Sequence, residues 1–482
     1  MTALGEAGGL IGCAGLGLLL VARHRLLRLG GLAGWGLGLG ALALALLPDV
    51  SRVALAAAAV VACVLAIVGA WVLLRWPYLL AFVTLLLVPA RIPVNIGSQQ
   101  ANLLLPLYAV IGALAFALGW QLLHGDERAR ELGTIAWPLA AFVVWSGITI
   151  LWTPDLRKGE LFLGAFLLPF GVLAIGFARL PWRGRRLTWL WGALAATALA
   201  YVLVGAYQWL TRDVFWNPGL IVGNAYATFF RVNSVFWDPS VYGRYLVVAI
   251  LATLAVILLD GARGRRVAVL YAVVCVTWLG LLISFSQSSF FALSVGIVVA
   301  AAVAWGVRAA AAIVAVALVA VTVTVAVPRL RHAVVNKSTS GINKVTSGRS
   351  NLVGQGMRIA LDHPVVGVGV GGFSHEYARR VGFSGKDPKR SASHTTPVTV
   401  FAEQGLVGLG LYLALVVTML ASTLRGVGRG FTSRVSLAVG LGLVAITVHC
   451  LFYADFFEDP MTWALLGLAG LVAGMPKKAG AS

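Results

Sequence analysis

Beyond residue 230, arginines and one histidine lie beside apolar runs, and their side chains suit phosphate chemistry. Arg231 and Arg349 each offer a planar guanidinium, which binds two phosphate oxygens at once and stays charged at physiological pH. His394 offers an imidazole, which can accept a proton from an attacking hydroxyl near neutral pH. Together they predict a site in which the arginines hold a phosphate group and His394 acts as the catalytic base.

Glu403 follows His394 inside the same apolar run, where ionisable side chains are rare and usually functional. Two roles stay open for it. It could pair with an arginine and fix the preceding loop, or it could act as a general base, and we place it with His394 among the predicted catalytic residues. Alternatively, His394 is simply a hydrated polar residue at the start of a helix. His449, inside another apolar run, is either functional or a hydrogen-bond partner of a neighbouring helix.

The acidic residues do not predict a metal site. No pair of carboxylates is placed to hold a metal ion against a diphosphate, which is how Mg²⁺ usually acts in phosphate chemistry. Asp455, Glu458 and Asp459 form one acidic cluster near the C-terminus. Acids in such a short loop are usually just hydrated, so we expect neither a metal nor a cofactor.

The composition excludes an ordinary soluble protein. Hydrophobic residues make up 60% of the chain and charged residues 11%, whereas about a quarter of the residues are charged in soluble domains. Apolar runs of roughly 20 residues, long enough to cross a bilayer, recur along the whole length, which predicts an all-α polytopic membrane protein with about 12 to 15 transmembrane helices. The four cysteines all fall inside such runs, which favours buried free thiols over disulfides.

The net charge of +20 follows the expected membrane topology. Lys and Arg gather in alternate loops, such as residues 23–28, 179–186 and 425–434, as the positive-inside rule requires of cytoplasmic loops. This distribution explains most of the excess, so the charge does not favour nucleic-acid binding. It predicts a cytoplasmic C-terminus and an outer location for the segments around Arg231 and His394.

Loop lengths divide the chain into four segments. We predict N-terminal transmembrane helices in residues 1–210, central ones in 211–327 with an outer loop at 211–241, a long extracytoplasmic loop in 328–393, and C-terminal transmembrane helices in 394–482. The long loop is strongly basic although it lies outside, which favours an anionic ligand. Its apolar periodicity from Leu352 to Leu361 predicts a short amphipathic helix that begins near Arg349.

Five motifs follow one another between residues 231 and 410. They are Arg231 with Phe236 and Asp238-Pro239, Arg349, His363 to Phe373, His394, and Glu403 to Gly408. This order and spacing resemble the O-antigen ligase and polymerase superfamily, which are polytopic glycosyltransferases that use polyprenyl-diphosphate-linked sugars. Two positions depart from the family pattern. Thr395 replaces the usual Asn after the histidine, and Ser286 to Ser289 lacks the family's arginine outside a span. Arg231 or Arg244 is the expected replacement for that missing phosphate ligand.

The resemblance implies a GT-C-like fold and a metal-independent enzyme in the bacterial inner (cytoplasmic) membrane, with its active site facing the periplasm or cell exterior. Its expected partners are a polyprenyl-diphosphate-linked glycan donor, a lipid or glycan acceptor and membrane lipids, without nucleic acid. Ligation of the glycan to the acceptor is the first interpretation, and polymerisation of repeat units by the same donor chemistry is the second. An alternative from a different functional class is a transporter of polysaccharide or lipid. Against it, the chain has no obvious internal repeat of the kind many transporters show.

Overall fold

The computed structural model describes residues 2–47, 51–96, 99–181, 185–226, 229–260, 263–326, 349–382, 392–428 and 431–475, and nearly all of them are helical. The helices of the first half are α1 (Thr2–Val21), α2 (Arg25–Leu46), α3 (Arg52–Arg75), α4 (Leu79–Leu87), α5 (Leu105–Leu123), α6 (Ala136–Thr149), α7 (Leu156–Phe162), α8 (Leu168–Ala178) and α9 (Arg185–Thr211). Those of the second half are α10 (Pro218–Tyr226), α11 (Pro239–Asp260), α12 (Arg265–Ser284), α13 (Gln287–Trp305), α14 (Val307–Ala326), α17 (Arg349–Asp362), α18 (Phe373–Val381), α19 (Thr396–Leu424), α20 (Phe431–His449) and α21 (Pro460–Ala473).

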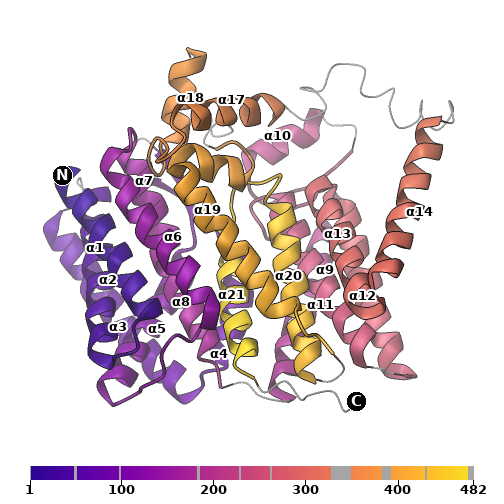
Figure 1. The fold of residues 1–482 in the computed structure, drawn as a ribbon, viewed down its shortest axis with the longest axis horizontal. Helices are drawn as coiled ribbons and strands as arrows, with labels where there is room; N and C mark the ends of the chain where they lie inside the picture. The colour runs from indigo at the N-terminus through magenta and orange to yellow at the C-terminus, as the bar shows by residue number, and fades with distance from the viewer. Residues whose placement is uncertain are drawn as a thin grey trace.

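The long helices run side by side as one bundle (Figure 1). Among the described residues, 12 helical segments are long and apolar enough to cross a membrane, and Val307–Val319 and α21 add two shorter apolar ones. This confirms the prediction of an all-α polytopic membrane protein. The division of the chain into four segments stays a prediction.

Burial separates the helices of the centre from those at the edge. Every residue of α8 is buried, and so are nearly all residues of α21. By contrast, α3 is exposed over most of its length, with Val53 and Trp71 among its exposed side chains. Both kinds of helix are apolar all round, because a transmembrane helix faces either other helices or lipid tails. The bundle therefore keeps a packed centre around α8, α11 and α21 (Figure 1).

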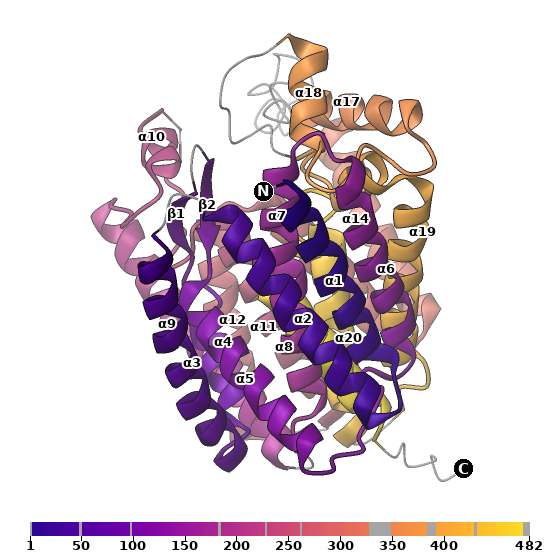
Figure 2. The ribbon, with the colours of Figure 1, turned by 90° about the vertical axis from the view of Figure 1, so that its left-hand side faces the viewer.

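Short elements cover one end of the bundle, the upper end in Figure 1. We call this end the loop layer and define it as the described parts of residues 92–103, 212–238, 349–395 and 450–459. It holds α10, α17, α18 and a two-stranded antiparallel hairpin of β1 (Ile92–Ile96) and β2 (Gln99–Leu103). Figure 2 shows the hairpin and α10 on one side of this layer and α17 and α18 on the other. The hairpin is a difference from the all-helical expectation, and Arg91 beside it donates to the Glu458 carbonyl oxygen at 3.0 Å.

The amphipathic helix predicted in the long loop is confirmed as α17, which begins at Arg349. Leu352, Ile359 and Ala360 are buried, whereas Leu361 on another face is exposed. Residues 328–348 and 383–391 of the same predicted loop lie outside the described residues.

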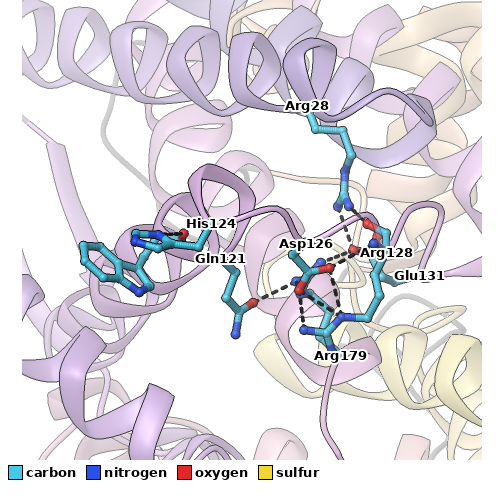
Figure 3. A network of polar contacts seen from close by, with 8 residues as sticks. Arg28, Gln121, His124, Asp126, Arg128, Glu131 and Arg179 are labelled. Atoms are coloured by element: carbon cyan, nitrogen blue, oxygen red, sulfur yellow. Dashed lines mark hydrogen bonds and ion pairs between the residues drawn. The ribbon is translucent and has the colours of Figure 1, made fainter.

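A network of ion pairs fixes the opposite end of the bundle (Figure 3). Glu131 accepts from Arg28 at 2.7 Å and from Arg179 at 2.5 Å. Asp126 accepts from Arg179 and from Arg128, each at 2.5 Å. We call these five residues the far-end network. It joins α2, the end of α8 and the segment after α5, so several of the basic residues at this end have a structural role.

Candidate active site

His394 lies in the loop layer directly before α19, on a backbone that holds it in an uncommon conformation. Its φ of +61° is in the left-handed region, which residues other than glycine rarely adopt and which is enriched at functional sites. The neighbouring Ser393 side chain donates to the Thr395 carbonyl oxygen at 2.9 Å, and the Thr396 amide donates to the Cys450 carbonyl oxygen at 2.9 Å. His394 is therefore held between two anchored residues, with its side chain partly exposed.

A series of hydrogen bonds connects this anchor to the predicted arginine site. Next to Cys450, the His449 ring contacts the Ser288 hydroxyl at 3.1 Å, and Ser288 contacts Ser286 at 3.3 Å. The Ser286 amide donates to the Ser284 hydroxyl, and the Ser284 carbonyl oxygen accepts from Arg231 Nε at 3.3 Å. Ser286 to Ser289, the segment in which the family pattern has an arginine, thus links Arg231 to the backbone that holds His394.

Arg231 is half-buried and held mainly through its backbone. Its amide donates to Asn224 Oδ1 at 3.0 Å, and its carbonyl oxygen accepts from Asn224 Nδ2 at 2.9 Å. The following Val232 amide donates to the Ile283 carbonyl oxygen at 3.3 Å. These contacts hold the part of the 212–238 loop that carries Arg231 against the end of α12. At this place a guanidinium could bind a ligand in the loop layer.

Glu403 fixes a glycine-rich loop, residues 364–372, against α19. Its Oε1 accepts from the Phe373 amide at 3.2 Å. Its carbonyl oxygen accepts from the Gly369 amide at 2.8 Å, and the Val368 amide donates to the Ala402 carbonyl oxygen at 3.0 Å. Of the two roles left open by the sequence, this geometry supports fixing the loop, with backbone amides as partners where we expected an arginine.

The helix is interrupted where the loop joins it. Gly405 has φ +66° and ψ −166° inside α19, a conformation that only glycine adopts easily. The break leaves the Leu406 amide to donate to the Pro364 carbonyl oxygen at 2.8 Å. A Cβ on Gly405 would collide with the Val365 backbone, and one on Gly367 would collide with the Glu403 backbone. Glycine is required at both positions, because two backbones meet there at close range.

Helix α7 contacts the other side of the glycine-rich loop and the start of α18. Lys158 contacts the Ser374 hydroxyl, and the Gly159 amide lies so close to Gly371 that a side chain would not fit. Asp155 caps α7 by accepting from the Lys158 amide at 3.2 Å. The sequence analysis did not identify these residues. Their only signal was a short polar stretch, Thr153 to Lys158, in a loop on the predicted outer side.

Arg349 begins α17, and its side chain lies outside the described structure. The helix packs beside the start of α19, because a Cβ on Gly356 would meet side chains of Val398, Phe373 and Ser393. Ser393 directly precedes His394. The structure thus brings the helix that Arg349 begins against the segment that carries His394.

Arg244 is buried in α11 and bound to two carboxylates. Its guanidinium donates to both Asp455 oxygens at 2.5 and 2.7 Å and lies 2.8 Å from Asp459 Oδ2. It also lies 3.4 Å from His449 Nδ1. We call these four residues the loop-layer network. The Arg244 charge is already balanced there, so its role as a diphosphate ligand stays a prediction that would require the network to open.

Two of the three acids in the 450–459 loop are buried rather than hydrated, and Glu458 is half-buried. Asp455 and Asp459 are both nearly inaccessible. Burial alone would raise the pKa of Asp455, but the bidentate contact with Arg244 lowers it below its usual value. Burial raises the pKa of Glu458 to about 7, against the nearby charge of Arg91. The sequence could have suggested this pairing, since a lone arginine inside an apolar run needs a partner.

One group of side chains in this loop has donor atoms that a metal ion could use. His449, Cys450 and Asp455 place one such atom each within 4.8 Å of one another. However, both Asp455 oxygens already accept from Arg244, whose positive charge would repel a cation. The donor set therefore fits an ion-pair network better than a metal site.

Comparison with protein-family models finds a similarity over part of the chain. Residues 270–413 match the family model described as O-antigen ligase. The matched range contains His394, Glu403, the glycine-rich loop and α17, whereas Arg231 and Arg244 precede it. No curated protein matches the chain. This match over part of the chain, together with the helical membrane fold around it, supports the resemblance to the O-antigen ligase and polymerase superfamily.

Proposed function

We propose that this protein transfers a glycan from a polyprenyl-diphosphate carrier to a hydroxyl of an acceptor lipid or glycan. The observation that carries the proposal is the placement of His394. It precedes α19 in a left-handed conformation, and hydrogen bonds connect its anchoring backbone to Arg231. A base and a cation in one layer, above apolar helices, suit a lipid-linked donor.

The reaction needs one bond to form and one to break. The acceptor oxygen attacks the anomeric carbon of the donor sugar, and its proton passes to the His394 imidazole. The bond from the anomeric carbon to the diphosphate oxygen breaks, and the electron pair leaves with the diphosphate. Arg231 and Arg349 stabilise the charge that develops on the leaving group. Glu403 keeps the glycine-rich loop in place, and it is the second candidate for the base.

We propose that no divalent metal takes part, because arginines supply the positive charge at the leaving group. Activity in excess EDTA should equal untreated activity. Loss in EDTA that magnesium or manganese restores would contradict this part of the proposal.

Ligation to an acceptor is our first choice, and polymerisation of repeat units is the second, since both use the same donor and the same bond changes. Purified protein supplied with the donor alone distinguishes them. A polymerase extends the glycan on its carrier, whereas a ligase releases the carrier only when a separate acceptor is present. Movement of intact donor across a vesicle membrane without transfer would instead support a transporter.

The loop layer should face the outside of the cytoplasmic membrane, as the loop charges predict. In a cysteine-free background, His375→Cys on the exposed face of α18 should react with an impermeant thiol reagent in intact spheroplasts. Glu127→Cys, exposed at the opposite end, should react only after lysis. The reverse pattern would place the site in the cytoplasm.

Substitution of His394 tests the proposed mechanism directly. Loss of a general base typically lowers the rate by about 10²–10⁴-fold, so His394→Ala should abolish most transfer while donor binding remains. His394→Asn keeps a hydrogen-bonding group but no basicity and should be equally inactive. Wild-type activity should fall below roughly pH 6–7 as an imidazole protonates. His375→Ala, an exposed histidine in the same layer, is the matched control and should keep full activity; a fully active His394→Ala would locate the base elsewhere.

A further inference from the structure

A half-open cavity of about 680 Å³ lies between helices of the bundle and reaches the end away from the loop layer. Its walls come from α4, α8, α9, α11, α12, α20 and α21, and Leu187, Trp191, Val256 and Leu465 are typical of its lining. The volume is within the range of about 300–1,000 Å³ found for small-molecule sites. An apolar space of this size between transmembrane helices suits a hydrocarbon chain.

One end of the cavity is basic. Arg265, Arg266 and Arg434 line it, and they come from the first turns of α12 and α20. Neither helix has an acidic residue in its first turn, although an acid there would complement the positive end of the helix dipole. The positive charge of the arginines thus adds to that of two helix ends, which favours an anion at this point.

The other arginines at this end of the bundle have a different environment. Arg28 and Arg179 are bound by the carboxylates of the far-end network. In the part of the chain that the structure describes, neither Arg265 nor Arg266 takes part in an ion pair. The positive-inside rule explains why arginines occur at this end, but it does not explain why two of them border an apolar cavity.

We propose that this cavity binds an anionic glycerophospholipid, with the phosphate on Arg265 and Arg266 and an acyl chain along the apolar walls. Basic pockets between transmembrane helices are known to take anionic head groups. A small water-soluble anion would leave the apolar walls unfilled. A polyprenyl diphosphate is a poorer fit, because the arginines proposed to hold its head group lie in the loop layer at the other end. The bound lipid would join α9, α12 and α20 at their first turns.

The test compares phospholipids on the purified full-length protein after its native lipid has been exchanged for detergent. Binding is measured by native mass spectrometry, and stabilisation by the apparent unfolding temperature. Phosphatidylglycerol should bind and raise the unfolding temperature, whereas phosphatidylcholine of the same acyl chains should do neither. The double variant Arg265→Gln/Arg266→Gln should bind phosphatidylglycerol at least about tenfold more weakly, because it loses two charge-assisted contacts to the phosphate.

Two further variants keep the result clear. Arg263→Gln removes the same charge two residues before the cavity, at an exposed position that does not line it, and should bind like wild type. Ala438→Trp fills the apolar part while all three arginines remain, and should also weaken binding. Equal binding of both phospholipids, or unchanged binding in both the double and the Trp variants, would overturn the proposal. Preferred binding of undecaprenyl phosphate over phosphatidylglycerol would do so too, and would assign the cavity to the carrier lipid.

Discussion

Ion-pair networks at the two ends hold the bundle, and they distribute their charges differently. In the far-end network each carboxylate has two arginine partners: Asp126 binds Arg128 and Arg179, and Glu131 binds Arg28 and Arg179. In the loop-layer network the ratio is reversed, because Asp455 and Asp459 share Arg244. Among the described residues, Arg244 is the only arginine within ion-pair distance of either acid.

The two networks therefore differ in whether a carboxylate keeps an arginine partner after one arginine is lost. Removing one partner of a buried ion pair is costly because a buried charge is left without compensation. The far-end network can lose one arginine and still leave a partner for each acid. The loop-layer network cannot, and it also anchors the loop whose Cys450 carbonyl holds the start of α19. The end of the molecule that carries the proposed chemistry is therefore the more sensitive of the two.

The largest effect should come from Arg244→Ala, which leaves two buried carboxylates without their arginine. Breaking a buried pair typically costs about 3–5 kcal/mol, so we expect a large fall in unfolding temperature in detergent together with loss of transfer. Arg244→Lys keeps one charge but loses the bidentate contact and should give an intermediate result. A stable and active Arg244→Ala protein would show that the 450–459 loop does not depend on this network.

A smaller effect is expected from Arg28→Ala, because Glu131 keeps Arg179. The loss should be nearer the value for hydrogen bonds to a charged group, about 1.5–3 kcal/mol, with transfer activity unchanged. Arg128→Ala removes a side chain that is 53% exposed and should cost only about 0–1 kcal/mol. Unfolding temperatures of the three variants in one detergent test this ranking. A greater loss for Arg28→Ala than for Arg244→Ala would refute the argument from redundancy.

The smallest effect is a difference in the pH dependence of stability at the two ends. Glu458 has a pKa raised to about 7 by burial, so the folded state keeps a proton that the unfolded state releases. Its contribution should decline as pH rises from about 4.5 to about 7. Burial opposes ionisation of Asp126, but hydrogen bonds from Arg128 and the charge of Arg179 lower its pKa to about 2. Its contribution is present above about pH 4 and declines as pH falls towards 2.

Unfolding temperatures measured from pH 3 to 8 separate these two groups. Glu458→Gln should flatten the dependence of the unfolding temperature on pH between pH 5 and 7. Asp126→Asn should change this dependence only below about pH 4. An unaltered profile in Glu458→Gln would mean that this carboxyl is ionised throughout the range.

The sequence predicted the features that depend on local pattern. Hydropathy gave the membrane spans, and apolar periodicity gave α17 with its first residue at Arg349. The position of His394 at the start of α19 followed from the end of the polar loop before it. The hairpin of β1 and β2 was missed, because the mixed polar and apolar residues 92–103 beside an apolar run give no clear strand signal.

Contacts between distant segments were beyond the sequence alone. Arg244 and Asp455 are far apart in the chain, and only the packing of α11 against α20 brings them together. The same packing turns Arg244, an expected phosphate ligand, into the centre of an ion-pair network. Glu403 was predicted to be functional with an arginine as its partner, but its partners are backbone amides, and amide positions carry no signature in the residue types.

The break in α19 at Gly405 has a mechanical consequence for His394. Residues 396–404 are bonded to the glycine-rich loop and to the 450–459 loop, whereas the residues beyond the break continue through the bundle. Tilt of the lower part of α19, such as a change in bilayer thickness imposes, can be absorbed at the glycine. The break thus separates the segment that follows the proposed base from the lower part of α19.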